Sequence, residues 1–292
     1  MFSVANQLGE QHEVTQRFSI VFCDLPAIRK SANEPDDTSH APLQILIVPP
    51  CMDGEYYLSP DEVVRKWILR QHACGAIVCS VCAGAFILAQ AGLLENRQAT
   101  THWNLASAFS HRYPGVNLDI NKILINDGDV ITAAGLMSWI DLGLELVAQL
   151  MHPRIMRQLG RMMVVDTGRR EQRYYQNFYP RLNHGDQAIL KAQHYLQKHF
   201  SEPFRISALS ELSILTQRTF LRRFVKATGM KPIQYLQRLR TQKACDLIES
   251  TNKTIESISL EVGYGDTSAF RKAFMKNVGL TPRDFRSRFT SG

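Results

Sequence analysis

The sequence has little of several features that mark other classes of protein. Six cysteines in 292 residues do not make a small disulfide-stapled scaffold, because a chain of this length can bury two hydrophobic cores without covalent staples. The 17 glycines and 12 prolines are too few for a collagen-like fibre. Charged residues make up 21% and hydrophobic residues 45%, which excludes a disordered chain. The length predicts about two domains.

The chain also lacks a recognisable leader and a convincing membrane span. Its first 17 residues have no basic start followed by a long apolar stretch, so we expect a cytoplasmic protein with reduced thiols. Residues 73–94 carry no charge and are long enough to cross a bilayer. Glycines and polar side chains interrupt them, however. A buried strand, a small-residue turn and a buried helix explain them better.

Positive charge is concentrated in one half of the chain. Residues 1–155 hold 10 basic and 16 acidic side chains, a net charge of −6, and residues 156–292 hold 24 basic and 11 acidic ones, a net charge of +13. Such a split is typical of a polyanion-binding module fused to a different domain. We predict a first domain over 1–152, a basic and aromatic linker over 153–186, and a second domain over 187–292. The linker arginines that could contact DNA or the other domain are Arg169, Arg170 and Arg173.

The first half alternates strand and helix signals. Two strand-like runs, QILIV and AIVCSV, are apolar throughout, as strands covered on both faces must be. This alternation predicts an α/β domain with a doubly wound, mostly parallel sheet of the flavodoxin-like type. The expected strands are Phe18–Phe22, Gln44–Val48, Ala76–Val81, Lys122–Ile125 and Val130–Ala133. The expected helices are Asp61–His72, Ala83–Ala91, Trp103–Arg112 and Ser138–Met151.

The second half is helical and contains an internal repeat with an offset of 50 residues. FLRRFVKATGMKPIQYLQRL (220–239) aligns with FRKAFMKNVGLTPRDFRSRF (270–289). Each copy has two Phe four residues apart, which places both rings on one helix face. Each then has a Gly that can end the helix and a Pro that can start the next one. These residues are Phe220, Phe224, Gly229 and Pro232, and then Phe270, Phe274, Gly279 and Pro282.

A shorter helix signal precedes each copy, over Ser207–Ser213 and Ile255–Val262. A break follows each of them, and Thr216 and Asp266 are suited to cap the next helix. A short helix, a tight turn and a capped second helix form the helix-turn-helix pattern, so we predict an all-α domain with two such units. The helix between them, Ile233–Ser250, would span about 27 Å, close to one turn of a DNA duplex (~34 Å).

The outward faces of the two capped helices are basic. With the Phe rings inward, the opposite faces of a helix with about 100° per residue are available to a partner. Arg can donate two hydrogen bonds to guanine in the major groove, and Ser can contact a base edge or a phosphate. Solvated surface charge is the alternative, but two capped basic helices in one basic segment favour DNA binding. The outward residues are Arg218, Arg222 and Lys226, and then Ser268, Arg271, Lys272 and Lys276.

The last hundred residues resemble the AraC/XylS family of transcription regulators. The resemblance rests on the two helix-turn-helix units and on the closing segment EVGYGDTSAFRKAFMKNVGLTPRDFR. It implies a fold of seven helices. Base-contacting positions by this resemblance are Arg218, Leu221 and Arg222, and then Thr267, Ser268, Arg271 and Lys272. We expect double-stranded DNA, RNA polymerase, a small-molecule effector and a second copy of the chain, as a homodimer, to be the partners.

A cysteine lies between a predicted strand and a predicted helix. In SVCAG, residues 80–84, small residues flank Cys82 with the spacing of a nucleophile elbow. A helix N-terminus favours the thiolate, and His102 follows a possible short strand, so a catalytic Cys–His pair is one interpretation. A residue that touches a signal molecule and a small residue imposed by the turn are the others. Cys79 and Cys82 form a C-x-x-C without a second ligand pair, which argues against a metal site.

These residues resemble the ThiJ/PfpI branch of the class I glutamine amidotransferase-like superfamily, over roughly residues 1–151. Cys82 matches its elbow cysteine and His102 its nearby histidine, and fusion to an AraC-type domain is a known regulator architecture. The first strand of that family and its acidic residue are absent, so we expect that the true start lies upstream or that the domain is trimmed. The turn Pro49–Gly54 contains prolines, which offer no N–H group to an oxyanion.

The sequence therefore predicts a sequence-specific DNA-binding transcription regulator, controlled by a small metabolite that binds the first domain. No enzyme activity, cofactor or metal is expected. The alternative is a Cys-dependent hydrolase or amidase that uses Cys82 and His102. A redox sensor using Cys79 and Cys82 is weaker, because Cys79 lies inside an apolar strand, where a thiol is usually inert.

Overall fold

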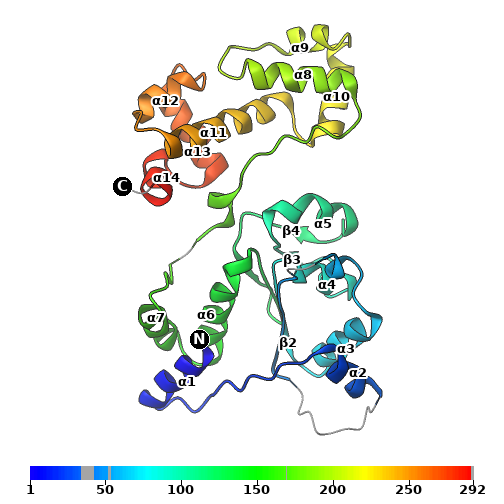
Figure 1. Ribbon diagram of the computed structural model, residues 1–292, viewed down its shortest axis with the longest axis vertical. Helices are drawn as coiled ribbons and strands as arrows, with labels where there is room; N and C mark the ends of the chain where they lie inside the picture. Colours follow the sequence, from blue (N-terminus) through cyan, green and yellow to red (C-terminus); the bar gives the residue numbers. More distant parts are fainter. Residues whose placement is uncertain (34–42, 52–53, 169, 291–292) are drawn as a thin grey trace. The chain divides into compact units, whose positions relative to one another are not determined.

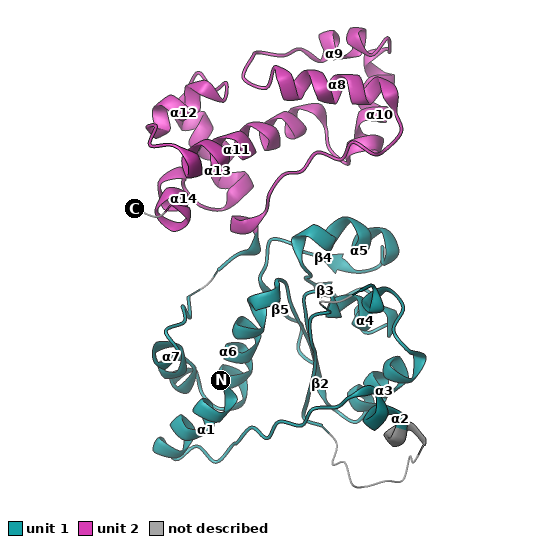
Figure 2. Ribbon diagram, in the orientation of Figure 1, with its two compact units in different colours: residues 1–172 teal, residues 173–292 magenta. Residues whose placement is uncertain are grey.

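The computed structural model describes residues 1–33, 43–51, 54–168 and 170–290. The chain divides into two units, Met1–Gln172 and Arg173–Gly292 (Figure 2). The first unit is an α/β domain and the second is all helical, as the sequence predicts. Within the described residues, no helix is both long and apolar enough to cross a membrane.

The first unit is built on a four-stranded sheet in the order β1-β2-β6-β5. The first three of these strands are parallel, and β5 pairs antiparallel with β6 at one edge. A separate pair, β3 and β4, is parallel. The strands are β1 (Ile45–Val48), β2 (Ile77–Val81), β3 (Gln98–Ala99), β4 (Asn117–Leu118), β5 (Leu124–Asn126) and β6 (Val130–Ala133). The sheet is therefore mostly parallel, with one antiparallel edge strand.

Helices cover both faces of this sheet (Figure 1). Consecutive side chains of a strand point to opposite faces, so Val78 packs with α3 and α4 while Cys79 packs with α6. A further layer, α1 and α7, packs on the outer side of α6. The helices are α1 (Phe2–Gln11), α2 (Leu25–Asn33), α3 (Glu62–Ala73), α4 (Gly84–Gln90), α5 (Ala106–Arg112), α6 (Trp139–Leu150) and α7 (Pro153–Met162). Single 3-10 turns are Tyr56–Leu58, Trp103–Leu105, Leu136–Ser138 and Gln172–Tyr175.

One expected strand is absent: the prediction for Phe18–Phe22 was wrong. The segment is extended, and the exposed fraction of its side chains reaches 93% at Phe22. The backbone N–H and C=O groups of Phe18 bond to the side-chain amide of Asn6 at 2.8 Å each, instead of to a neighbouring strand. The β-like pattern is present, but no strand of the described residues pairs with it.

The segment predicted as a linker, 153–186, is shared between the units. Its first part forms α7, where Ile155 and Leu159, four residues apart, are buried against α6. Arg170 pairs with Asp141 of the first unit, with two nitrogen–oxygen distances of 2.7 and 2.9 Å. Arg169, which we considered as a contact residue, lies outside the described residues.

The second unit contains seven helices among its described residues and two hydrophobic cores that share α11. Tyr235 and Leu236, near the start of α11, belong to the first core with α8, α9 and α10. Ala244 and Ile248, near its end, belong to the second core with α12, α13 and α14. The helices are α8 (Gln187–Lys198), α9 (Ile206–Leu212), α10 (Gln217–Thr228), α11 (Pro232–Ser250), α12 (Ile255–Glu261), α13 (Thr267–Val278) and α14 (Pro282–Phe289).

Candidate nucleic-acid interface and cysteine turn

The first helix-turn-helix unit consists of α9, a three-residue turn, Thr216 and α10. The hydroxyl oxygen of Thr216 accepts a hydrogen bond from the backbone N–H of Thr219 at 3.4 Å, which confirms the predicted cap. Phe220 and Phe224 are fully buried in the first core. Gly229 ends α10 with φ +75°, a conformation that costs glycine little.

The second unit repeats this geometry with α12 and α13. Both carboxylate oxygens of Asp266 accept hydrogen bonds from the first turn of α13, from the N–H groups of Ser268 and Ala269 at 3.0 and 2.9 Å. These bonds hold the pKa of Asp266 below its ordinary value. Phe270 and Phe274 are buried in the second core, and Gly279 ends α13 with φ +86°. The two copies of the repeat therefore fold in the same way.

The predicted contact residues mostly lie on the outer faces of α10 and α13. Five of them, Arg218, Arg222, Lys226, Lys272 and Lys276, are exposed. Within the described part of the chain, no ion pair or hydrogen bond occupies the side-chain nitrogens of these five residues. Their positive charges are therefore available to a polyanion.

The other predicted contact residues differ in their surroundings. Leu221 is half-buried and packs against the first core. Ser268 is exposed and Thr267 is half-buried. Arg271 is exposed and forms an ion pair at 3.0 Å with Glu256 of α12, which is equally exposed. An exposed pair of this kind is worth at most about 1 kcal/mol, so a phosphate or a base can replace Glu256 at little cost.

Two arginines that fix the helices were not found from the sequence. Arg223 donates two hydrogen bonds to Asp186, the cap of α8, and so ties α10 to α8. Arg240 of α11 donates to the backbone oxygens of Phe200, Glu202 and Gly263, at 2.7, 3.0 and 2.9 Å. Their partners lie 23 to 40 residues away, and no local pattern marks contacts of that range.

The turn between β2 and α4 has the shape that its residues predict. Cys82 has φ +55°, an unusual conformation for a residue with a side chain. A Cβ atom on Gly84 would lie 2.9 Å from the carbonyl oxygen of Val48, so only glycine lets α4 start this close to β1. Cys82 thus sits on a sharp strand-to-helix turn. Of the turn Pro49–Gly54, residues 52–53 lie outside the described residues.

The thiol of Cys82 is half-buried just before the start of α4. Burial raises its pKa, and the one opposing effect is a backbone hydrogen bond from Ala83. His102 lies next to a residue that contacts Cys82, because the hydroxyl of Thr101 donates a hydrogen bond to the carbonyl oxygen of Cys82 at 2.8 Å. The Nδ1 atom of His102, however, accepts a hydrogen bond from the N–H of Asn104 at 3.1 Å, and burial lowers the pKa of its ring. Among the described residues no hydrogen bond joins the thiol to the ring.

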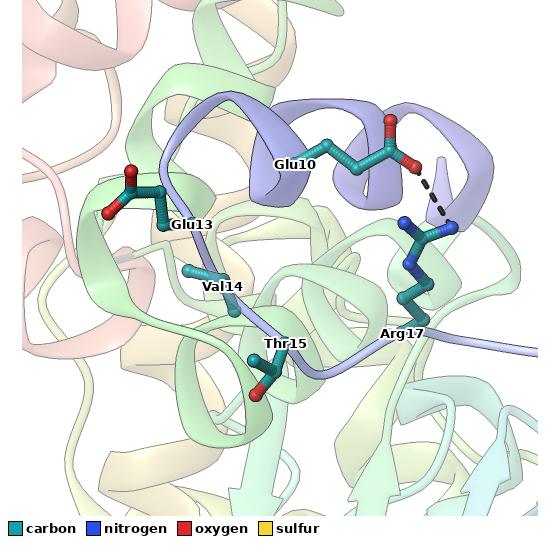
Figure 3. A pocket seen from close by; sticks show the side chains of 5 residues that line it. All are labelled: Glu10, Glu13, Val14, Thr15 and Arg17. Carbon is teal, nitrogen blue, oxygen red and sulfur yellow. Dashed lines mark ion pairs between the residues drawn. The ribbon is translucent and has the colours of Figure 1, made fainter.

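Two other features of the first unit bear on ligand chemistry. Across the described ranges, no three His, Cys, Asp or Glu side chains are grouped so that they could hold a metal ion. A shallow hollow at the end of α1 is lined by five residues that include an ion pair between Arg17 and Glu10 at 3.0 Å (Figure 3). None of its lining residues comes from the Cys82 turn, so this hollow gives no support to a site there.

Comparison with known proteins matches both units. Residues 27–149 match the DJ-1/PfpI family, and residues 209–288 match the helix-turn-helix domain. The HTH-type transcriptional regulator CdhR of Pseudomonas aeruginosa is 26% identical over 223 residues, covering 76% of this chain and 66% of CdhR. The HTH-type transcriptional regulator GlxA of Rhizobium meliloti is 25% identical over 252 residues, covering 82% of this chain and 74% of GlxA.

Both alignments are longer than either unit, so each takes in parts of both. The chain spans just under two thirds of the length of CdhR. Among solved structures, the C-terminal domain of AraT, a response regulator from Geobacillus stearothermophilus, is 28% identical, covering 36% of this chain and 88% of that domain with a TM-score of 0.35. The chain therefore joins a domain of the DJ-1/PfpI family to a helix-turn-helix domain of the AraC type.

Proposed function

We propose that the chain is a sequence-specific DNA-binding transcription regulator, and that α10 and α13 read successive major grooves of one duplex. The observation that carries the proposal is the duplicated, capped helix with exposed, unpaired basic side chains. The 19 residues of α11 between the two units span about 28 Å at 1.5 Å per residue, which is close to the ~34 Å between equivalent positions of a groove. Both relatives described above are named transcriptional regulators, and we expect RNA polymerase to be a partner of this chain on DNA.

The contact residues have different expected roles. Arg222 and Arg218 can each donate two hydrogen bonds to guanine, and Ser268 is suited to a base edge or a phosphate. Lys226 and Lys276 lie near the ends of their helices and are expected to bind phosphate, which adds affinity without sequence preference. Leu221 is suited to a thymine methyl group.

The test begins with selection of duplexes from a random pool by the full chain, followed by affinity measurements on the enriched sequence. Arg222→Ala and Lys272→Ala are each expected to weaken binding of the enriched duplex roughly 10- to 100-fold, the effect of losing a base contact. Binding of an unrelated duplex should weaken much less. If about eight phosphates are neutralised, the logarithm of affinity falls with the logarithm of salt concentration with a slope near −7.

Lys66→Ala is the matched control. It removes one positive charge from the first unit, where Lys66 is exposed and pairs with Glu62 at 2.9 Å, and it should change DNA affinity less than twofold. A wild-type chain that enriches no sequence, or an Arg222→Ala chain that binds the enriched duplex as well as wild type, would contradict the proposal.

We further propose that the first unit binds a small-molecule effector and that Cys82 is not a nucleophile. A Cys–His pair needs a ring nitrogen that can accept the thiol proton, and the lone pair of His102 Nδ1 is already engaged by Asn104. With Nδ1 as an acceptor, Nε2 carries the proton of the neutral ring. The positive φ of Cys82 then serves the packing of α4 against β1 rather than catalysis.

Alkylation kinetics distinguish the two roles of Cys82. In a chain with Cys23, Cys51 and Cys74 replaced by Ser, leaving buried Cys79 and Cys245, the rate of reaction with iodoacetamide should rise about tenfold per pH unit from pH 7 to 9. An activated thiolate would instead give a plateau near neutral pH. Such a plateau would overturn this assignment.

A further inference from the structure

The last residue of the first unit is held inside that unit by its side chain. Gln172 is only 4% exposed, although it directly precedes the second unit. Its Oε1 atom accepts a hydrogen bond from the N–H of Trp103 at 2.8 Å. Its Nε2 atom donates to the carbonyl oxygens of Thr101 and Ile120 at 3.1 and 2.7 Å. Every donor and acceptor group of this amide except one lone pair is therefore used.

The neighbouring residues are held in the same way. The backbone N–H of Gln172 donates to the carbonyl oxygen of Asn121 at 2.7 Å, and Glu171 forms an antiparallel bridge with Lys122. Arg170 makes its paired contact with Asp141 at the start of α6. Residues 170–172, which we name the strap, thus bind three separate parts of the first unit.

The loop that receives Gln172 also borders the cysteine turn. Thr101 is fully buried and donates through its hydroxyl to the carbonyl oxygen of Cys82. Its own carbonyl oxygen accepts from Gln172, and the residue after it is His102. Cys82, Thr101 and Gln172 are therefore consecutive members of one hydrogen-bonded chain. Any group that binds at Cys82 or His102 and shifts this loop must also disturb the bonds of Gln172.

We propose that Gln172 is a positioning residue that couples occupancy of the Cys82 turn to the start of the DNA-binding unit. With the loop in the position seen here, the strap is docked and fixes the point from which the second unit leaves. When a molecule at Cys82 displaces Thr101–Trp103, the strap is released and the second unit gains freedom. This regulation rests on the proposed function. The strap, either docked or released, is the two-state element that coupling between two sites requires.

The test uses the full chain and N-ethylmaleimide as the molecule placed on Cys82, in the background that lacks Cys23, Cys51 and Cys74. The readout is the rate of tryptic cleavage after Arg170 and Arg173, because a docked strap protects this backbone. Gln172→Ala removes three side-chain hydrogen bonds and should raise this rate about a hundredfold. Gln187→Ala, an exposed residue at the start of α8, is the matched control and should leave it unchanged.

The coupling itself is read from the combination of adduct and variant. The adduct on Cys82 should speed cleavage at least tenfold in wild type but should add less than twofold in Gln172→Ala, because the strap is already free. Gln172→Glu keeps the acceptor for Trp103 but places a carboxylate oxygen against the carbonyl oxygens of Thr101 and Ile120, so it should speed cleavage at least as much as Gln172→Ala. An adduct that changes nothing in wild type, or that acts equally on wild type and Gln172→Ala, would refute the coupling.

A second measurement does not depend on any Gln172 variant folding. The amide hydrogens of Trp103 and Gln172 should exchange slowly in the unlabelled chain, and both should become faster together when Cys82 carries the adduct. Acceleration of neither amide, or of Trp103 alone, would overturn the proposal. Neither readout involves DNA. Failure of the chain to select a duplex would therefore contradict the proposed function, whereas the cleavage and exchange rates would still decide whether the strap responds to the adduct.

Discussion

Removing the carboxylate of Asp186 should unfold the helical unit at a lower temperature without affecting the α/β unit. Asp186 accepts a hydrogen bond from the N–H of Ile189 at 3.2 Å as the cap of α8, and it accepts two from Arg223 of α10 at 2.9 and 2.6 Å. Asp186→Ala loses the cap, worth about 1 kcal/mol, and a partly exposed two-bond ion pair, worth about 1 kcal/mol. Arg223 is 37% exposed and can turn to water, so no buried charge is left unpaired.

The expected loss of about 2 kcal/mol corresponds to a fall in Tm of roughly 10 °C for a unit of this size. Two signals separate the units. The three Trp residues, Trp67, Trp103 and Trp139, all lie in the first unit, so their fluorescence follows that unit alone. Far-ultraviolet circular dichroism follows the helices of both. Asp186→Ala should lower the Tm of the helical unit seen by circular dichroism and leave the Tm seen by fluorescence unchanged.

Asp186→Asn is the matched comparison, because Asn is a good cap but has no charge; it should cost about 1 kcal/mol. The hydrogen bonds from Arg223, together with that from Ile189, lower the pKa of Asp186. A carboxyl group whose pKa is lowered by folding stabilises the fold above its unfolded value, near pH 4, and loses this contribution as the pH falls through the folded value. The difference between wild type and Asp186→Asn should therefore shrink as the pH falls below about 4 and vanish only below the folded pKa of Asp186. Equal shifts in fluorescence and dichroism, or no shift, would refute the reasoning.

Three further predictions concern packing and charge. Gly84→Ala places a Cβ atom 2.9 Å from the carbonyl oxygen of Val48 and should destabilise the first unit by roughly 1–3 kcal/mol, seen as a lower fluorescence transition with the dichroism of the helical unit retained. Phe274→Ala empties a fully buried site in the second core and should cost about 3–5 kcal/mol, whereas truncation of its exposed neighbour Met275 should cost less than about 0.5 kcal/mol. Arg97→Gln should raise the pKa of Asp129 towards its ordinary value, because the hydrogen bond from Arg97 is the largest cause of its lowering; a carboxyl titration by NMR that shows no rise would contradict this.

Local chemistry was predictable from the sequence, and contacts between distant residues were not. Helix ends are one example: the caps at Thr216 and Asp266 and the left-handed glycines that end α10 and α13 depend only on residues within one helical turn. The local sequence is therefore enough to predict them. The bend at Cys82 was predictable for the same reason. The strap was missed because the side chain of Gln172 bonds to residues 52 to 71 positions away, and a single Gln in a polar segment gives no signal of burial.

Two segments of the first unit depend on contacts that the local pattern does not show. The pattern of Phe18–Phe22 favours a strand, but a strand needs a partner, and here Asn6 satisfies Phe18 instead. The segment 153–162, which we assign to the linker, docks on α6 through Ile155 and Leu159, with Met156 packed beside them. Apolar residues at i and i+4 were visible there and outweigh the surrounding charge. For the candidate site, exposure of the basic side chains followed from the repeat, whereas the pairing of Arg271 with Glu256 did not.

The number of residues in the shared helix α11 sets the spacing of α10 and α13. Because one continuous helix enters both cores, inserting a single residue at its middle would advance α13 by about 1.5 Å and rotate it by about 100° about the axis of α11. Four inserted residues would leave α13 rotated by about 40° beyond a full turn and add about 6 Å. Each insertion would change the distance between α10 and α13 by a known amount, and the separation of the preferred half-sites on DNA should change with it.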